Sequence, residues 1–172
     1  MHAFTVGHGT RPLSELIETL SEAEVRTLVD VRRFPGSRRN PQFNQGPMGE
    51  ALEDAGIAYR HAVELGGRRS GEPGEEEFAC IRTPAFRSYA ARMRSPEWQD
   101  ALATELAQPA PCFMCAETPG WKCHRRLIAE LLTARGHDVT HLLGPGKTQT
   151  HAFYDESEIR DGKLFLCGAF VA

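Results

Sequence analysis

Hydrophobic residues along this chain form short β-rich runs that alternate with longer segments of helical spacing. The runs that predict strands cover residues 3–7, 27–32, 57–65, 111–117 and 138–143. The segments that predict helices cover residues 13–24, 48–56, 86–93, 97–106 and 123–135. Because strands and helices alternate almost throughout, the pattern predicts an α/β fold with a mostly parallel sheet.

The predicted fold is a single three-layer α/β domain over residues 1–172, with about five strands in the sheet and helices on both faces. Right-handed crossovers predict that the second and third strands lie on one side of the first strand, and the fourth and fifth on the other. Ligands in such sheets bind beyond the carboxyl ends of the strands, where the strand order reverses. We therefore expect the binding crevice between residues 7–11 and 115–126.

Two long polar segments, residues 32–47 and 66–78, are rich in glycine and arginine. Loops of this length inside a compact domain are usually functional, so we interpret them as binding loops and not as linkers. The segment 153–167 is a tail that we expect to pack against the body, because Leu164, Phe165 and Leu166 favour burial.

Composition narrows the class of protein. The chain has 172 residues and a formal net charge of -3, which argues against a protein that coats polyanions, so any nucleic-acid contact would need a local patch. The start of the chain lacks a signal-peptide core, and no apolar run reaches membrane-spanning length. The five cysteines are an odd number at irregular spacing. We therefore expect a cytoplasmic protein without membrane association, whose thiols are free for metal binding or chemistry.

The most reactive residue types gather in residues 115–126. Cys115 and Glu117 follow a predicted strand, and Cys123, His124 and Arg125 begin a predicted helix. The free N–H groups and the dipole of a helix N-terminus stabilise anions and thiolates. If this segment has no functional role, Cys115 is simply a buried core residue and the arginines are solvated. We favour the functional interpretation, with Cys123, or alternatively Cys115, as the nucleophile.

The same cluster could instead bind a metal. Cys115, Cys123 and His124 are suitable ligands for zinc or iron, although their spacing is not that of a zinc finger, and the sequence requires no cofactor. A phosphatase-type loop is absent, because Trp121 stands where that motif has arginine.

Two further residues are candidates for acid–base chemistry. His8 lies between two glycines and could be a general base or merely part of a tight turn. Asp30 ends the second predicted strand, where it could be catalytic or could form a structural pair with Arg32. Glu117, in the cluster at residues 115–126, is a third candidate acid or base.

Arginine pairs occur in the long loops and at the start of the last helix. Phe34, Phe43 and Asn44 are interleaved with the pair Arg38 and Arg39, as a surface that stacks bases would require. The residues predicted to bind the ligand are Arg11, Arg32, Arg38, Arg39, Phe43, Asn44, Arg68, His124 and Arg125. We expect His8, Arg11, Cys115, Glu117 and His124 to line one crevice.

Several blocks of the chain together resemble a known family. They are TVGHGTRPLSELIETL, LVDVRRFPGSRRNPQFN, LGGRR, FRSYAARM and MCAETPGWKCHRRLIAELLTARGHDVTHL. In this order they resemble the bacterial domain-of-unknown-function 488 family over essentially the whole chain. The resemblance implies an α/β fold and a cytoplasmic bacterial setting, and it implies no particular reaction.

The function expected from the sequence is an enzyme, a hydrolase or transferase, that acts on a phosphate-bearing small molecule or nucleic acid. One alternative is a non-catalytic module that binds the same ligand. The other is a transition-metal-binding protein that uses the cysteine and histidine cluster.

Overall fold

The computed structural model describes residues 1–172, apart from the side chain of Trp121. Its main sheet contains the strands β1 (His2–Gly7), β2 (Thr27–Asp30), β3 (Ala58–His61), β4 (Pro111–Cys115), β5 (Asp138–Gly144) and β6 (Lys147–Thr150). The helices are α1 (Leu13–Glu22), α2 (Gln45–Asp54), α3 (Pro84–Arg92), α4 (Pro96–Leu106) and α5 (Arg125–Ala134). Strands β1 to β5 are parallel, and β6 pairs antiparallel with β5. The predicted α/β fold with a mostly parallel sheet is confirmed.

The predicted strand order is wrong. The order in the sheet is β3-β2-β4-β1-β5-β6, so β4 lies between β2 and β1 and not on the far side of β1. All five residues of β4 are buried, as expected for a central strand covered on both faces. Hydrophobic runs show that a strand is central, but they do not show which neighbours it has.

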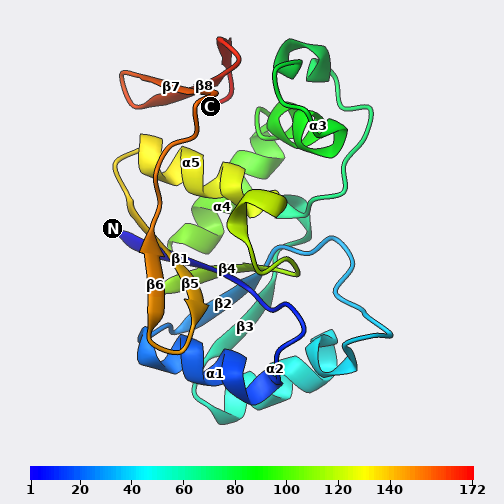
Figure 1. Ribbon diagram of the computed structural model, residues 1–172, viewed down its shortest axis with the longest axis vertical. Helices are drawn as coiled ribbons and strands as arrows, with labels where there is room; N and C mark the ends of the chain where they lie inside the picture. Colours follow the sequence, from blue (N-terminus) through cyan, green and yellow to red (C-terminus); the bar gives the residue numbers. More distant parts are fainter.

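The sheet separates two hydrophobic cores. Helices α1 and α2 cover one face, and α3, α4 and α5 cover the other (Figure 1). Alternate residues of β1 serve the two sides, since Ala3 belongs to the core under α3 to α5 and Val6 to the core under α1 and α2. The helix that follows β1 and the helix that follows β4 therefore leave the sheet on opposite faces, and this opens a crevice at the carboxyl ends of these two strands.

The polar loops contain more structure than the sequence predicts. Helix α2 begins at Gln45, three residues before its predicted start, and short 3₁₀ turns lie at Pro41–Phe43, Val63–Leu65, Glu75–Phe78 and Gly120–Lys122. The predicted third strand ends at His61, because the chain turns into the second of these 3₁₀ turns.

The tail forms a small antiparallel sheet of β7 (Ser157–Arg160), β8 (Lys163–Leu166) and β9 (Ala169–Phe170), which lies above α5 (Figure 1). Leu164 and Leu166 are buried in the core beside α5, whereas Phe165 is half-buried. A disulfide joins Cys80, after the third 3₁₀ turn, to Cys167, after β8. The expectation of free thiols is therefore wrong for this pair, and it holds for Cys112, Cys115 and Cys123.

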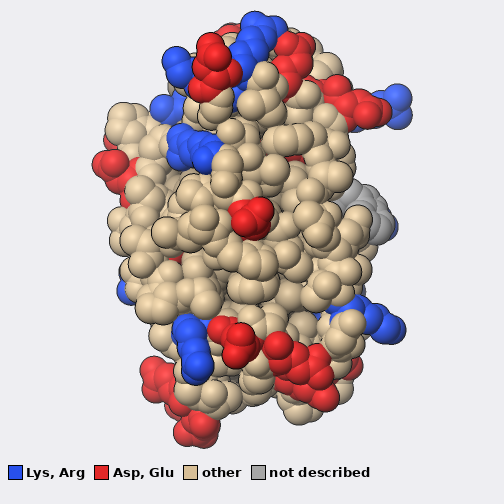
Figure 2. All heavy atoms as spheres, turned by 90° about the vertical axis from the view of Figure 1, so that its left-hand side faces the viewer, with Lys and Arg blue, Asp and Glu red and all other residues tan. Residues whose placement is uncertain are grey.

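Figure 2 shows the side of the molecule that lies at the left of Figure 1, beside β6. Charged side chains gather toward its two ends and are sparse across its middle, so this face offers no broad basic surface to a polyanion. Among the residues that the structure describes, no helix is long and apolar enough to cross a membrane.

Candidate functional site

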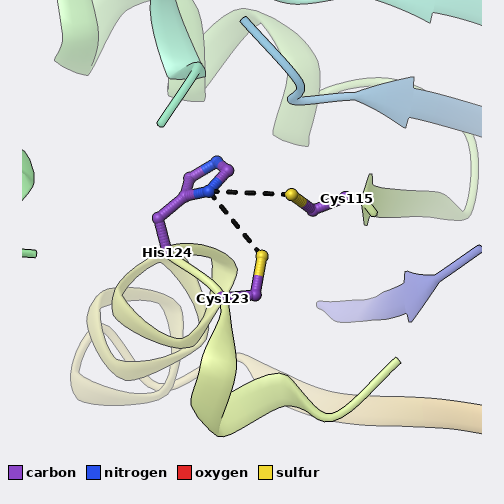
Figure 3. Close-up of side chains that lie close together, drawn as sticks. All are labelled: Cys115, Cys123 and His124. Carbon is purple, nitrogen blue, oxygen red and sulfur yellow. Dashed lines mark hydrogen bonds between the residues drawn. The ribbon is translucent and has the colours of Figure 1, made fainter. Parts of the chain in front are cut away.

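The structure brings Cys115, Cys123 and His124 together. Cys115 ends β4, and Cys123 and His124 immediately precede α5, so their side chains converge from the sheet and from the helix start (Figure 3). His124 Nδ1 lies 3.7 Å from the sulfur of Cys115 and 3.7 Å from the sulfur of Cys123. All three side chains are buried, with Cys115 the most accessible at 9%.

Backbone atoms from two other connections fix the ring of His124. Its Nε2–H donates a hydrogen bond of 3.0 Å to the carbonyl of Val31, just beyond β2, which leaves Nδ1 facing the two sulfurs. Gly67 packs against the ring so closely that a Cβ at this position would lie 2.4 Å from Nδ1. Tyr89 contacts the ring edge-on, with 4.8 Å between centroids. The imidazole is thus held in one orientation.

The two cysteines have opposite acidities. The hydrogen bond from the Cys123 thiol lowers the pKa of Cys115 to about 4, against the effect of burial and together with His124 and the Ala116 backbone. Burial, followed by the neighbouring Cys115 sulfur, raises the pKa of Cys123 well above its ordinary value. These opposite directions favour Cys115 over Cys123 as the thiolate, whereas the sequence favoured Cys123 as the nucleophile.

Two cavities flank the Cys115 thiolate. One has a volume of about 90 Å³ and is lined by Arg32, Arg33, Phe34, Gly67, Arg68, Cys115, Ala116 and His124. The other has a volume of about 180 Å³ and is lined by Arg68, Ala85, Phe86, Cys115, Ala116, Glu117, Lys122, Cys123 and His124. A ligand at Cys115 therefore meets several cations, with Arg68 in the wall of both cavities.

Asp30 and Arg32 form a buried structural pair. Arg32 donates from Nε and NH2 to the two carboxylate oxygens of Asp30 at 2.9 and 2.6 Å, and the hydroxyl of Tyr59 also donates to this carboxylate. Asp30 is 0% exposed, so the structural alternative fits it better than the catalytic one. Arg32 remains at the wall of the smaller cavity, where it adds fixed positive charge.

His8 lies on the side of the sheet away from His124. Its ring stacks on Phe43, its Nδ1–H donates to the Gly9 carbonyl, and Arg32 NH1 donates to its Nε2. Burial, the largest influence, lowers the pKa of His8, consistent with a neutral ring. His8 lines another open cavity of about 310 Å³, which shares Ala116 and Glu117 with the larger cavity at Cys115. The backbone N–H of His8 also donates to the Cys115 carbonyl at 3.0 Å.

Other expected ligand residues have structural partners. Phe43 is fully buried in the core, so it cannot stack against a ligand base. Arg11 donates to the Leu143 carbonyl and does not line either cavity at Cys115, and the Asn44 side chain accepts a hydrogen bond from the Ser37 backbone. The expected single crevice is therefore divided, and of its five members only Cys115, Glu117 and His124 lie at the cavities of this site.

Arg125 organises the loop between the two cysteines. It is 1% exposed and donates to the carbonyls of Glu117 and Thr118, so its burial removes it from the ligand surface. The same loop packs on the end of β1, where a Cβ at Gly7 would lie 1.9 Å from the Glu117 carbonyl oxygen. The missing side chain at Gly7 therefore makes room for this loop.

Arg38 and Arg39 are exposed on the loop before the first 3₁₀ turn, outside both cavities at Cys115. The exposed aromatic ring of this loop is Phe34, at 62%, and it lines the smaller cavity. Phe34 belongs to the base-stacking surface expected from the sequence, whereas Phe86 was not expected at the site. The Val31 carbonyl could not be predicted, because a backbone acceptor leaves no residue signature.

A pair of histidines, His141 and His151, lies beside another cavity, of about 460 Å³. His141 and His151 are joined by a hydrogen bond of 2.9 Å, and burial, followed by the charge of His151, lowers the pKa of His141 to about 4. Buried Glu130 lies 3.5 Å from His151. The walls of this cavity that the structure describes contain no lysine or arginine, in contrast to the cavities at Cys115.

Cys115, Cys123 and His124 also meet the requirements of a metal centre. Their three ligand atoms lie within 4.8 Å of one another. Tetrahedral zinc with bonds of about 2.3 Å to sulfur and about 2.0–2.1 Å to nitrogen would hold these atoms about 3.6 Å apart. The donation from His124 Nε2 to a backbone carbonyl is the outer contact usual for a metal-binding histidine.

Comparison with curated proteins and with solved structures finds no match. The family model described as Domain of unknown function DUF488 matches residues 12–132, which include β2, β4 and the first turns of α5 and therefore the whole Cys115, Cys123 and His124 cluster. By this match over most of its length, the chain belongs to the DUF488 family.

Proposed function

We propose that this protein is an enzyme in which the Cys115 thiolate attacks a phosphate-bearing ligand. The observation that carries the proposal is the Cys115 sulfur itself, which lines two cavities and lies 3.7 Å from an imidazole nitrogen with a fixed orientation. A thiolate with lowered pKa beside a histidine is the usual arrangement of a cysteine nucleophile.

The ligand is expected to be an anion because cations surround the thiolate. Arg32 and Arg33 line one cavity, Lys122 lines the other, and Arg68 lines both. Among the described residues, the Arg68 guanidinium has no hydrogen bond or ion pair within the protein, so it is available to fork onto a phosphate. The same charges would keep neutral or cationic ligands from competing for the site.

In the resting site, the proton that Cys115 has lost is held on Nδ1 of His124, which faces the sulfur. The thiolate then attacks the electrophilic centre of the bound ligand, and the imidazolium returns the proton to the leaving group. Water or a second substrate releases the covalent intermediate, which gives a hydrolase or a transferase. Cys123 remains a thiol, and its hydrogen bond tunes the nucleophile.

The test is protection of Cys115 against iodoacetamide by inorganic pyrophosphate, followed by peptide mass mapping. We expect pyrophosphate to slow alkylation of the wild type and to have little effect on Arg68→Ala. Arg82→Ala, which removes an exposed arginine outside both cavities, is the matched control and should behave as the wild type. Equal protection of Arg68→Ala and the wild type would contradict the proposed anion site, whereas a Cys115 that reacts no faster in the folded protein than in the unfolded chain would favour a non-catalytic binding module.

A metal centre is the second candidate, because three donor atoms converge and a fourth position is left for water or substrate. Metal analysis of the untagged protein separates the two candidates. Stoichiometric zinc or iron that is lost from Cys115→Ser would support the metal centre and would make the sulfur a ligand in place of a nucleophile. A folded, metal-free wild type with a reactive Cys115 would support the thiolate enzyme.

A further inference from the structure

The surroundings of Cys115 are similar on its two sides. Each cavity is lined by one phenylalanine ring, Phe34 in the smaller cavity and Phe86 in the larger, and by Arg68. The Arg33 guanidinium lies 5.5 Å from the centroid of Phe34 in the wall of the smaller cavity, and Lys122 lines the larger cavity together with Phe86. Cys115 and Arg68 line both cavities.

Phe34 has the exposure of a ligand-binding ring and not of a core residue. It is 62% exposed at the wall of the smaller cavity, and the Arg33 side chain beside it is tied to the Arg68 carbonyl by a 3.2 Å hydrogen bond. This bond joins the two long loops at the edge of the cavity. An exposed aromatic ring next to a fixed guanidinium can stack a nucleobase while the cation meets a phosphate.

Phe86 gives the larger cavity a ring of its own. Its half-buried ring packs on the core at the start of α3 and forms part of the wall of the larger cavity, where Lys122 adds an exposed positive charge. A mononucleotide has one base and would use one ring. A nucleic-acid strand presents bases and phosphates alternately, and it could use both rings while a linking phosphate lies at Arg68.

We infer that the ligand is single-stranded nucleic acid that passes over Cys115, with successive bases on Phe34 and Phe86 and the connecting phosphodiester beside the thiolate. This inference rests on the proposed anion site and names its substrate class. A duplex does not fit this arrangement, because its bases are paired and stacked on one another and are not free to lie on protein rings.

The experiment measures fluorescence anisotropy of fluorescein-labelled single-stranded hexanucleotides, one of DNA and one of RNA. We expect Phe34→Ala and Phe86→Leu each to weaken binding about fivefold or more, in line with the loss of one stacked base. Leucine at position 86 keeps an apolar side chain in the core, and thermal melting checks that the variant is folded. Phe153→Ala removes another exposed ring, outside both cavities, and should change affinity less than twofold.

Competition identifies the class of ligand. Unlabelled hexanucleotide should displace the probe at far lower concentration than a mononucleotide, a duplex of the same sequence or a phosphopeptide. Displacement by a mononucleotide or phosphopeptide at equal concentration would overturn the inference, and so would binding that Phe34→Ala leaves unchanged. Iodoacetamide reactivity measured on the same samples separates the two proposals: a reactive Cys115 without strand binding ends only this inference, and strand binding with an unreactive Cys115 ends the nucleophile.

Discussion

Gly67 leaves the space that the imidazole of His124 occupies. A Cβ at this position would meet three ring atoms at 2.4 to 2.9 Å, closer than any tolerable contact. The ring cannot move away without losing the bond from its Nε2 to Val31, which determines that Nδ1 faces the sulfurs. The glycine therefore positions the histidine through shape alone.

Gly67→Ala should displace the His124 ring and separate Nδ1 from Cys115. We expect the rate of Cys115 alkylation at pH 4.5 to fall about fivefold, because the thiolate loses a stabilising neighbour and the pKa of Cys115 rises above pH 4.5. Gly49→Ala is the control, since its Cβ would lie 3.6 Å from Tyr59, an ordinary contact inside a helix. An unchanged alkylation rate in folded Gly67→Ala would show that His124 does not tune the thiol.

The Asp30 carboxylate is needed to hold the Arg32 charge in a buried site. Asp30→Asn keeps the shape of the side chain and removes the counter-charge, which should lower the free energy of unfolding by about 3 kcal/mol in urea denaturation. Glu105→Gln is the matched change in the more exposed Arg60–Glu105 pair and should cost less than about 1 kcal/mol. Similar losses in the two variants would argue against a special role for the buried pair.

At the scale of elements, the position of β4 assembles the site. Because β4 lies between β2 and β1, its end at Cys115 adjoins Val31 on one side and the loop after β1 on the other. The order expected from the sequence would have put β1 between Cys115 and Val31. Periodicity predicted nearly every strand and helix of the sheet layers, but strand order depends on long-range packing that a hydrophobic pattern does not encode.

The disulfide between Cys80 and Cys167 holds the tail sheet against the body. Breaking this link, which joins residues 87 positions apart, should lower the free energy of unfolding by about 2–5 kcal/mol. Cys80→Ser should show this loss in denaturant and faster hydrogen exchange in β8, and reduced wild type should match it. If reductant destabilises Cys80→Ser as much as the wild type, the effect has another cause.

At the scale of the whole molecule, one edge of the sheet brings together the Cys115 sulfur, the fixed imidazole of His124 and the cationic side chains that line the two cavities. The cluster at residues 115–126 could be predicted because cysteine, histidine and arginine adjoin a strand end and a helix start. The role of each residue within the cluster could not be predicted, because the acidities of Cys115 and Cys123 depend on burial and on an interaction between residues eight positions apart. Arg125 and Phe43 were misassigned for the same reason, because burial decides whether a residue can reach a ligand.

The central claim is that Cys115 is a thiolate at neutral pH, and its alkylation rate as a function of pH tests this most directly. A pKa of about 4 means that the folded protein already lacks this proton at pH 5, so the iodoacetamide rate should stay nearly constant from pH 9 to pH 5 and fall only near pH 4. Cys112 is fully buried with a raised pKa and provides the slow internal reference in the same mass map. A Cys115 rate that falls tenfold per pH unit below about pH 8.5, as in the urea-unfolded chain, would contradict the account.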